Sequence, residues 1–150
     1  MKIQEAYNFF ESLKIETTNK SEIKIYEKIF HILAELKNRE FSKVEMESIE
    51  TELDNLNLKS NPKDKKKFFK KALSTFEKYL KDAFSLTSKG YFTNIGMGLG
   101  SSFGIIFGIV FLLRFERSLG IALGLSFGML IGLIIGKSLD SKAMSEGRVL

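Results

Sequence analysis

Glycine recurs at every fourth position through two uncharged stretches of this 150-residue chain. Residues 95–113 and 119–136 contain no Asp, Glu, Lys or Arg, and ten of the twelve glycines lie between 95 and 136. The pattern does not suit a helix in water, because each interior glycine costs about 1 kcal/mol relative to alanine. In lipid a helix tolerates glycine, since the backbone has to satisfy its own hydrogen bonds there. The spacing therefore predicts two membrane-spanning helices.

Nine glycines share this four-residue register and would line one face of each helix. Small residues at this spacing let another helix approach closely and are typical of helix association in membranes. A second stripe of small residues, Gly98–Ser102 and Ala122–Ser126, predicts a further face for helix packing. We predict helix packing and homo-oligomerisation through Gly96, Gly100, Gly104, Gly108, Gly120, Gly124, Gly128, Gly132 and Gly136, together with Ser102 and Ser126.

The two uncharged stretches have the length of a bilayer core. At about 1.5 Å per residue each one reaches about 27–28 Å, against a hydrocarbon thickness of about 30 Å. We expect a transmembrane hairpin over 92–136, with spans 95–113 and 119–136, a charged turn at 114–118 and a polar tail at 137–150. The alternative is a glycine-rich hairpin buried inside a soluble protein.

Residues 1–89 differ from this hairpin and read as a small helical domain. Apolar residues recur at helical spacing and predict four amphipathic helices, at roughly 3–15 and 21–38, after Ser42, and from Asn61-Pro62 onward. Ser42 and Glu45 form a capping box, in which each side chain satisfies a free backbone N–H group. The predicted fold class is therefore all-α, a small N-terminal helical bundle followed by a transmembrane glycine-zipper hairpin.

The charge of this first half changes sign along the chain. Residues 1–58 hold eight Lys and Arg against twelve Asp and Glu, whereas residues 59–89 hold ten against three. The basic run could pair with the acidic helices of its own domain, meet anionic lipid headgroups or bind nucleic-acid phosphates. We expect no nucleic acid, because no aromatic-plus-basic module is present. We expect a basic juxtamembrane helix at 62–89 and headgroup contacts at Lys63, Lys65, Lys66, Lys67, Lys70, Lys71, Lys89, Tyr91 and Lys137.

The composition excludes several kinds of chemistry. The chain has no cysteine, which rules out a disulfide scaffold, a Cys-ligated zinc site and a thiol nucleophile. The single histidine, His31, leaves no cluster for a metal or a catalytic triad, and we interpret it as a packed or half-exposed residue and not as a catalyst. No Walker loop or dinucleotide fingerprint is present in a fitting context. We predict no enzyme, no metal, no cofactor and no cleavable signal peptide.

Basic residues flanking the spans predict the topology. Lys78, Lys81 and Lys89 precede the first span, and Lys137, Lys142 and Arg148 follow the second, whereas the turn holds only Arg114 and Arg117. The positive-inside rule places both termini in the cytoplasm.

The glycine register resembles that of glycine-zipper membrane proteins, and small bacterial two-span proteins of this type look most similar. The resemblance implies homo-oligomerisation and a bacterial inner membrane, and it permits a pore. We therefore expect a small integral membrane protein that forms homo-oligomers and presents a cytosolic helical domain to a protein partner. The alternative is a pore-forming or channel-type effector, with a toxin or antiviral role, gated by the cytosolic domain.

Overall fold

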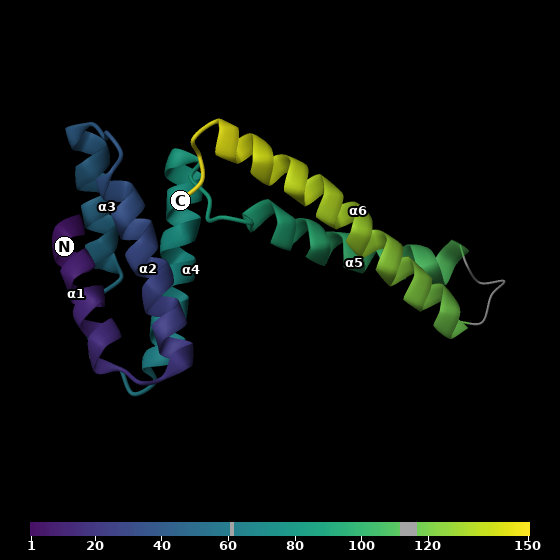
Figure 1. Cartoon of the computed structure of the whole chain (residues 1–150), viewed down its shortest axis with the longest axis horizontal. Coiled ribbons are helices and arrows are strands. Elements are labelled where there is room, and N and C mark those ends of the chain that lie inside the picture. Colours follow the sequence, from purple (N-terminus) through teal and green to yellow (C-terminus); the bar gives the residue numbers. More distant parts are fainter. Residues whose placement is uncertain (61, 112–116) are drawn as a thin grey trace. The chain divides into compact units, whose positions relative to one another are not determined.

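The computed structural model describes residues 1–60, 62–111 and 117–150. The chain is helical and divides into two compact units, residues 1–86 with Leu150 and residues 87–149 (Figure 1). The predicted fold class, an all-α chain with two long apolar helices in a hairpin after a helical N-terminal region, is confirmed. The helices are α1 (Ile3–Glu16), α2 (Lys20–Lys37), α3 (Lys43–Asn55) and α4 (Lys65–Phe84) in the first unit, and α5 (Tyr91–Phe111) and α6 (Arg117–Ser145) in the second.

Three aromatic rings from three helices form the centre of the first unit. Phe10 of α1, Tyr26 of α2 and Phe69 of α4 are buried, and their ring centroids lie 5.2 to 6.0 Å apart. Leucine and isoleucine side chains at helical spacing surround them, as the apolar pattern of the sequence predicts. The core around the rings contains Ile3, Ile29, Ile32, Leu33, Leu36, Ile49, Leu53, Leu73, Phe76 and Leu80.

Side-chain caps fix where the second and third helices begin. Asn19 accepts a hydrogen bond from the backbone N–H of Ser21 at the start of α2. The capping box before α3 is confirmed, because Ser42 accepts from the Glu45 N–H and the Glu45 carboxylate accepts from the Ser42 N–H. The Ser42 backbone N–H, and after it the Ser42 hydroxyl, interact with the carboxylate and hold the pKa of Glu45 below its ordinary value.

The prediction of one basic helix over 62–89 is wrong at both ends. Helix α4 begins at Lys65, because the Asp64 carboxylate accepts from the Lys67 N–H and caps the helix there; Asn61, the expected cap, lies outside the described residues. Ser85 ends α4 in a left-handed conformation with φ of 56°. The basic helix therefore stops at Phe84 and does not continue into the apolar segment.

The second unit is a hairpin of two long helices that lie side by side (Figure 1). Gly90, with φ of 77°, precedes α5, which begins at Tyr91 and so starts four residues before the expected span. Helix α6 runs on to Ser145, because nothing in 137–145 breaks it, so most of the expected polar tail is helical. Of the expected turn at 114–118, residues 114–116 lie outside the described residues, and residues 117 and 118 belong to α6.

Candidate functional site

The glycine faces of α5 and α6 meet each other within one chain. A Cβ atom built on Gly104 would overlap the carbonyl oxygen of Gly124 and would lie 2.9 Å from its carbonyl carbon and 3.0 Å from the Cα of Gly128. Real Cβ atoms essentially never come closer than 3.0 Å to another heavy atom. Backbone atoms of the opposite helix stand equally close to Gly96, Gly100, Gly108, Gly124, Gly128, Gly132 and Gly136.

The register of this contact follows from the four-residue spacing. Moving up α5 from Gly96 to Gly100, Gly104 and Gly108, the facing carbonyl oxygen moves down α6 in equal steps, from Gly132 to Gly120. Each approach brings a glycine Cα–H group toward a carbonyl oxygen of the other helix, a contact worth about 0.5–1 kcal/mol. The sequence predicted the packing face. In the structure, the second helix of the same hairpin packs against this face. Packing between copies of the chain stays a prediction.

An aspartate at the end of α6 caps the start of α5. The Asp140 carboxylate accepts hydrogen bonds from the backbone N–H groups of Phe92 and Thr93, at 3.0 and 2.9 Å, and from the Thr93 hydroxyl at 2.6 Å. These N–H groups have no partner within their own helix. Beside this cap, Gly136 lies against the backbone of Phe92 and Thr93. The chain therefore enters and leaves the hairpin at the same end.

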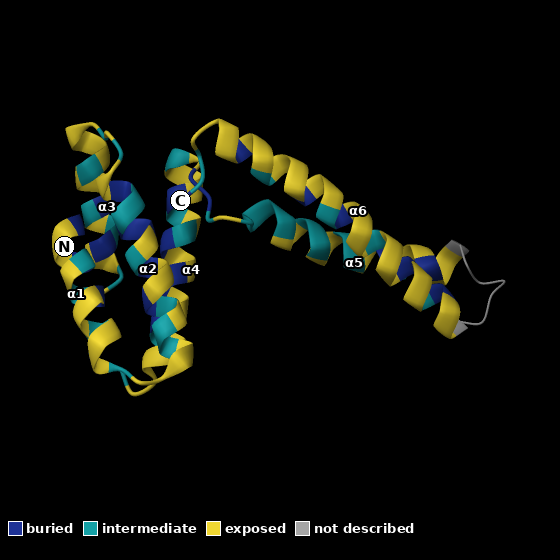
Figure 2. Ribbon diagram, in the orientation of Figure 1, coloured by how far each residue is buried: buried dark blue, intermediate teal, exposed yellow. Residues whose placement is uncertain are grey.

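Much of the outer surface of the hairpin is exposed (Figure 2), and large apolar side chains make up a great part of it. Among the described residues, twenty large apolar side chains are exposed, and eighteen of them belong to α5 or α6. Phe103 is 69% exposed, and Ile134 is 65% exposed. The large residue before each in-register glycine belongs to this surface; the set comprises Ile95, Leu99, Phe103, Phe107, Leu119, Leu123, Phe127, Ile131 and Ile135.

The small polar residues of the hairpin have local partners. Ser101, Ser102 and Ser126 each donate to the carbonyl oxygen four residues earlier, at 2.7, 3.0 and 2.8 Å. Ser102 and Ser126 are exposed, and no heavy atom comes within 4 Å of a Cβ built on Gly98. The second stripe of small residues therefore lies on the outer surface of the hairpin and takes no part in the contact between α5 and α6.

The residues expected to contact headgroups fall into two groups. Lys63, Lys65, Lys66, Lys67, Lys70 and Lys71 are exposed around the first two turns of α4. Lys89, Tyr91 and Lys137 belong to the second unit, where both lysines are exposed. The break at Ser85 separates the two groups along the chain.

The lysines of the basic run do not form ion pairs with the acidic helices of their own domain in the described residues. Within the described ranges, none of the six lysines from Lys63 to Lys71 forms an ion pair. Lys59, just before the run, pairs with Glu5, and its hydrogen bond and charge hold the pKa of Glu5 below the ordinary value.

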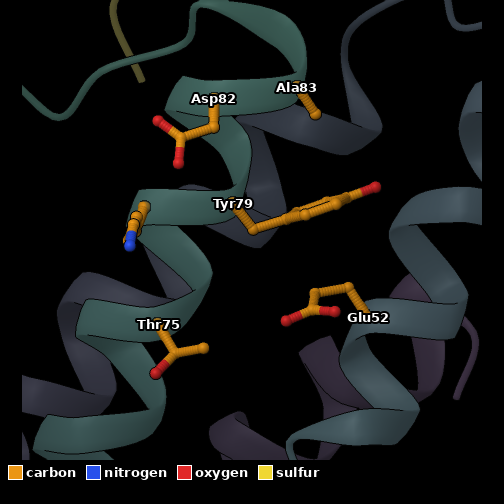
Figure 3. Close-up of a pocket in the computed structure, with 6 residues that line it drawn as sticks. Glu52, Thr75, Tyr79, Asp82 and Ala83 are labelled. Atoms are coloured by element: carbon orange, nitrogen blue, oxygen red, sulfur yellow. The ribbon is translucent and has the colours of Figure 1, made fainter.

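A pocket of about 450 Å³ lies between α3 and α4 (Figure 3). Tyr79 extends from α4 across this gap, and its hydroxyl lies 2.6 Å from the Ser48 hydroxyl of α3. Figure 3 shows Glu52 on α3 facing the α4 residues. The lining residues are Glu52, Thr75, Lys78, Tyr79, Asp82 and Ala83.

The chemistry of the pocket residues is that of an open, mixed-charge surface. It holds carboxylates and a lysine but no histidine, and His31 is exposed on α2. Within the part of the chain that the structure describes, no three His, Asp or Glu side chains are grouped closely enough to hold a metal ion.

Sequence reasoning missed two features of the molecule. The Asp140 cap could have been anticipated, since Asp140 is the first acidic residue after the second span and Thr93 stands at the start of the first. The second is a lysine stripe along α4, which continues past the dense run at 63–71 to Lys78 and Lys81. Its signal is the alternating three- and four-residue spacing of those positions.

A scan of protein-family models, a search of curated proteins and a search of solved structures each returned no match for this chain.

Proposed function

We propose that this chain is a small integral membrane protein, anchored by the α5–α6 hairpin, that presents the helical domain of residues 1–86 at the membrane surface. The observation that carries the proposal is the outer surface of the hairpin, where eighteen large apolar side chains are exposed. Soluble monomeric proteins rarely expose contiguous apolar patches of more than a few hundred Å². Lipid covers such a surface without any further partner.

The dimensions of the helices support two membrane crossings. Both helices are long and apolar enough to cross a bilayer, over Tyr91–Val110 and Ser118–Ser145. At about 1.5 Å per residue, α5 reaches about 31 Å and α6 about 43 Å, against about 30 Å of hydrocarbon. The last turns of α6, which contain Lys137, Asp140 and Lys142, then extend into the headgroup region.

The charges around the hairpin favour one orientation. Both of its ends lie on the side where Asp140 caps α5, and this side also carries Lys89, Lys137 and Lys142. By the positive-inside rule, this side faces the cytoplasm. In a bacterial cell this membrane is the inner membrane. The helical domain then lies on its cytoplasmic side, where it can bind a cytosolic protein partner.

A single charge on the outer surface tests the membrane location. Phe103→Arg places a cation on the face that we assign to lipid, at a cost of about 2.5–3.5 kcal/mol at the middle of a span. We expect this variant to lose resistance to alkaline extraction from membranes, whereas the wild-type chain resists it. Val44→Arg is the matched control, because Val44 is 76% exposed on the helical domain. If Phe103→Arg stays in the membrane fraction as firmly as Val44→Arg, the proposal is wrong.

The homo-oligomer predicted from the glycines remains part of the proposal in a modified form. Because the glycine faces meet within one chain, a second copy has to pack on the outer surface or exchange a helix. Chemical crosslinking in liposomes distinguishes a monomer from such an assembly. The competing hypothesis, a pore, predicts ion flux through proteoliposomes of the purified chain, whereas an anchor leaves them tight.

A further inference from the structure

The outward face of α4 carries a stripe of four lysines with Ser74 in its middle. Positions 67, 71, 74, 78 and 81 follow one another at intervals of four and three residues, so they lie on one face of the helix. All five side chains are exposed, and four of them are lysines. The buried residues of α4 lie on the other face, at Phe69, Ala72, Leu73, Phe76 and Leu80.

This stripe has the length and charge of a surface-binding element. From Lys67 to Lys81 it extends about 21 Å along the helix. Lys70 lies beside it and adds a further charge, while Glu77 and Asp82 are the acidic residues of α4 itself. Among the residues that the structure describes, Lys67, Lys70, Lys71 and Lys78 form no ion pair.

We propose that the lysine stripe of α4 docks the helical domain onto an anionic bilayer, with α4 lying along the membrane surface. The proposal rests on the proposed function, because the hairpin holds the domain next to the membrane. A tether of this kind raises the effective concentration of the second binding element to about the millimolar range. Each lysine near an anionic surface raises affinity about fivefold, since it contributes about 1 kcal/mol.

The chemistry of the stripe favours lipid over nucleic acid as its partner. Proteins that bind single-stranded nucleic acid combine a basic groove with aromatic side chains on which bases stack. The exposed stripe contains lysines and Ser74 and no aromatic residue. Ammonium groups along a single helix face can contact a flat array of headgroup phosphates together, and their attraction to it extends about 8 Å at physiological salt.

The absence of cysteine from the chain allows a direct test with single labels. Ser74→Cys places a fluorophore in the middle of the stripe, and Thr51→Cys places a control label on the exposed surface of α3 between two glutamates. The full-length chain is reconstituted in nanodiscs of phosphatidylcholine, alone or mixed with phosphatidylglycerol. Both lipid mixtures contain a spin-labelled headgroup that quenches nearby fluorophores.

The proposal predicts quenching of the Ser74 label in the anionic nanodiscs, its loss at high salt, and an unquenched Thr51 label throughout. The double variant Lys67→Gln/Lys71→Gln is expected to weaken docking about 25-fold, from about fivefold for each lysine. Equal quenching of the Ser74 label in both lipids, or in neither, would overturn the proposal. Protection of that label by an added RNA oligonucleotide, with no quenching by anionic lipid, would assign the stripe to nucleic acid and also overturn it.

The same experiment separates the docking from the membrane anchor on which it rests. A chain that enters neither kind of nanodisc refutes the proposed function and the docking with it. A chain that enters both kinds, with the Ser74 label unquenched in both, refutes the docking alone.

Discussion

A single methyl group at Gly104 should loosen the hairpin. Alanine at this position places its Cβ in overlap with the Gly124 carbonyl oxygen, whereas ordinary van der Waals contact begins at 3.4 Å. The helices then have to separate locally by roughly 1 Å, and a gap of that size forfeits up to about half of the attraction between the facing atoms. Gly98→Ala is the matched control, because its Cβ would enter open space.

The cost follows from three contributions. Overpacking a close contact costs about 1–3 kcal/mol, and the loss of one or two Cα–H···O contacts adds about 0.5–2 kcal/mol. The higher helix propensity of alanine returns at most about 1 kcal/mol. We therefore expect Gly104→Ala to lower the free energy of unfolding of the hairpin by about 0.5–4 kcal/mol after this gain is subtracted. Gly98→Ala should be neutral or stabilising by up to about 1 kcal/mol.

Energy transfer between two dyes measures this difference. Asn94→Cys and Lys137→Cys provide exposed attachment sites on α5 and α6. Sodium dodecyl sulfate added to mixed micelles separates the helices, and the midpoint of the transition reports their stability. If Gly104→Ala and Gly98→Ala unfold at the same midpoint as the parent chain, the close contact between the glycine faces is not what stabilises the hairpin.

Three further predictions concern caps and the core. Asp140→Ala removes the acceptor for the N–H groups of Phe92 and Thr93, and loss of such a cap costs about 1–2 kcal/mol. Hydrogen exchange at these two amides should therefore accelerate, and unchanged protection of the amides would contradict the cap. The pKa of Glu45 is lower in the folded chain than its ordinary value of 4.5. The ionised Glu45 side chain therefore stabilises the helical domain above pH 4.5, and this stabilisation is lost as the pH falls through the lower pKa of the folded state. Glu45→Gln should abolish this loss in acid melts followed by circular dichroism, and a pH dependence equal to wild type would count against it. Phe10→Ala removes a fully buried ring and should lower the stability of the helical domain by about 3–5 kcal/mol, which thermal melts would detect.

Periodic patterns in the sequence predict most of this fold. Apolar residues at helical spacing identified the four helices of the first unit, and the uncharged glycine stretches identified the two helices of the hairpin. These signals are local, because each arises from residues within a few turns of one another. The end of α4 was harder to predict. Ser85 adopts a left-handed conformation that is uncommon outside glycine, and no residue type in the sequence marks that position.

The partner of the glycine face could not be read from the sequence. Glycine at every fourth residue predicts that a helix will approach closely, but the same face fits a second copy of the chain or the neighbouring helix. The antiparallel register that pairs Gly104 with Gly124 depends on two segments twenty residues apart. The Asp140 cap likewise joins residues 47 and 48 positions apart, so it can be anticipated only once the two spans are interpreted as one antiparallel hairpin.

Accessibility of two single cysteines tests the central claim, that the hairpin crosses a membrane twice. Ser118→Cys lies near the start of α6, at the turn end of the hairpin, and Ser145→Cys lies at the other end of the same helix; both side chains are exposed. In spheroplasts of a bacterial host, a membrane-impermeant maleimide should label the cysteine at 118 and leave the one at 145 unlabelled until the membrane is broken. Equal labelling of both positions in intact spheroplasts, or of neither, would contradict a hairpin that crosses the membrane and returns.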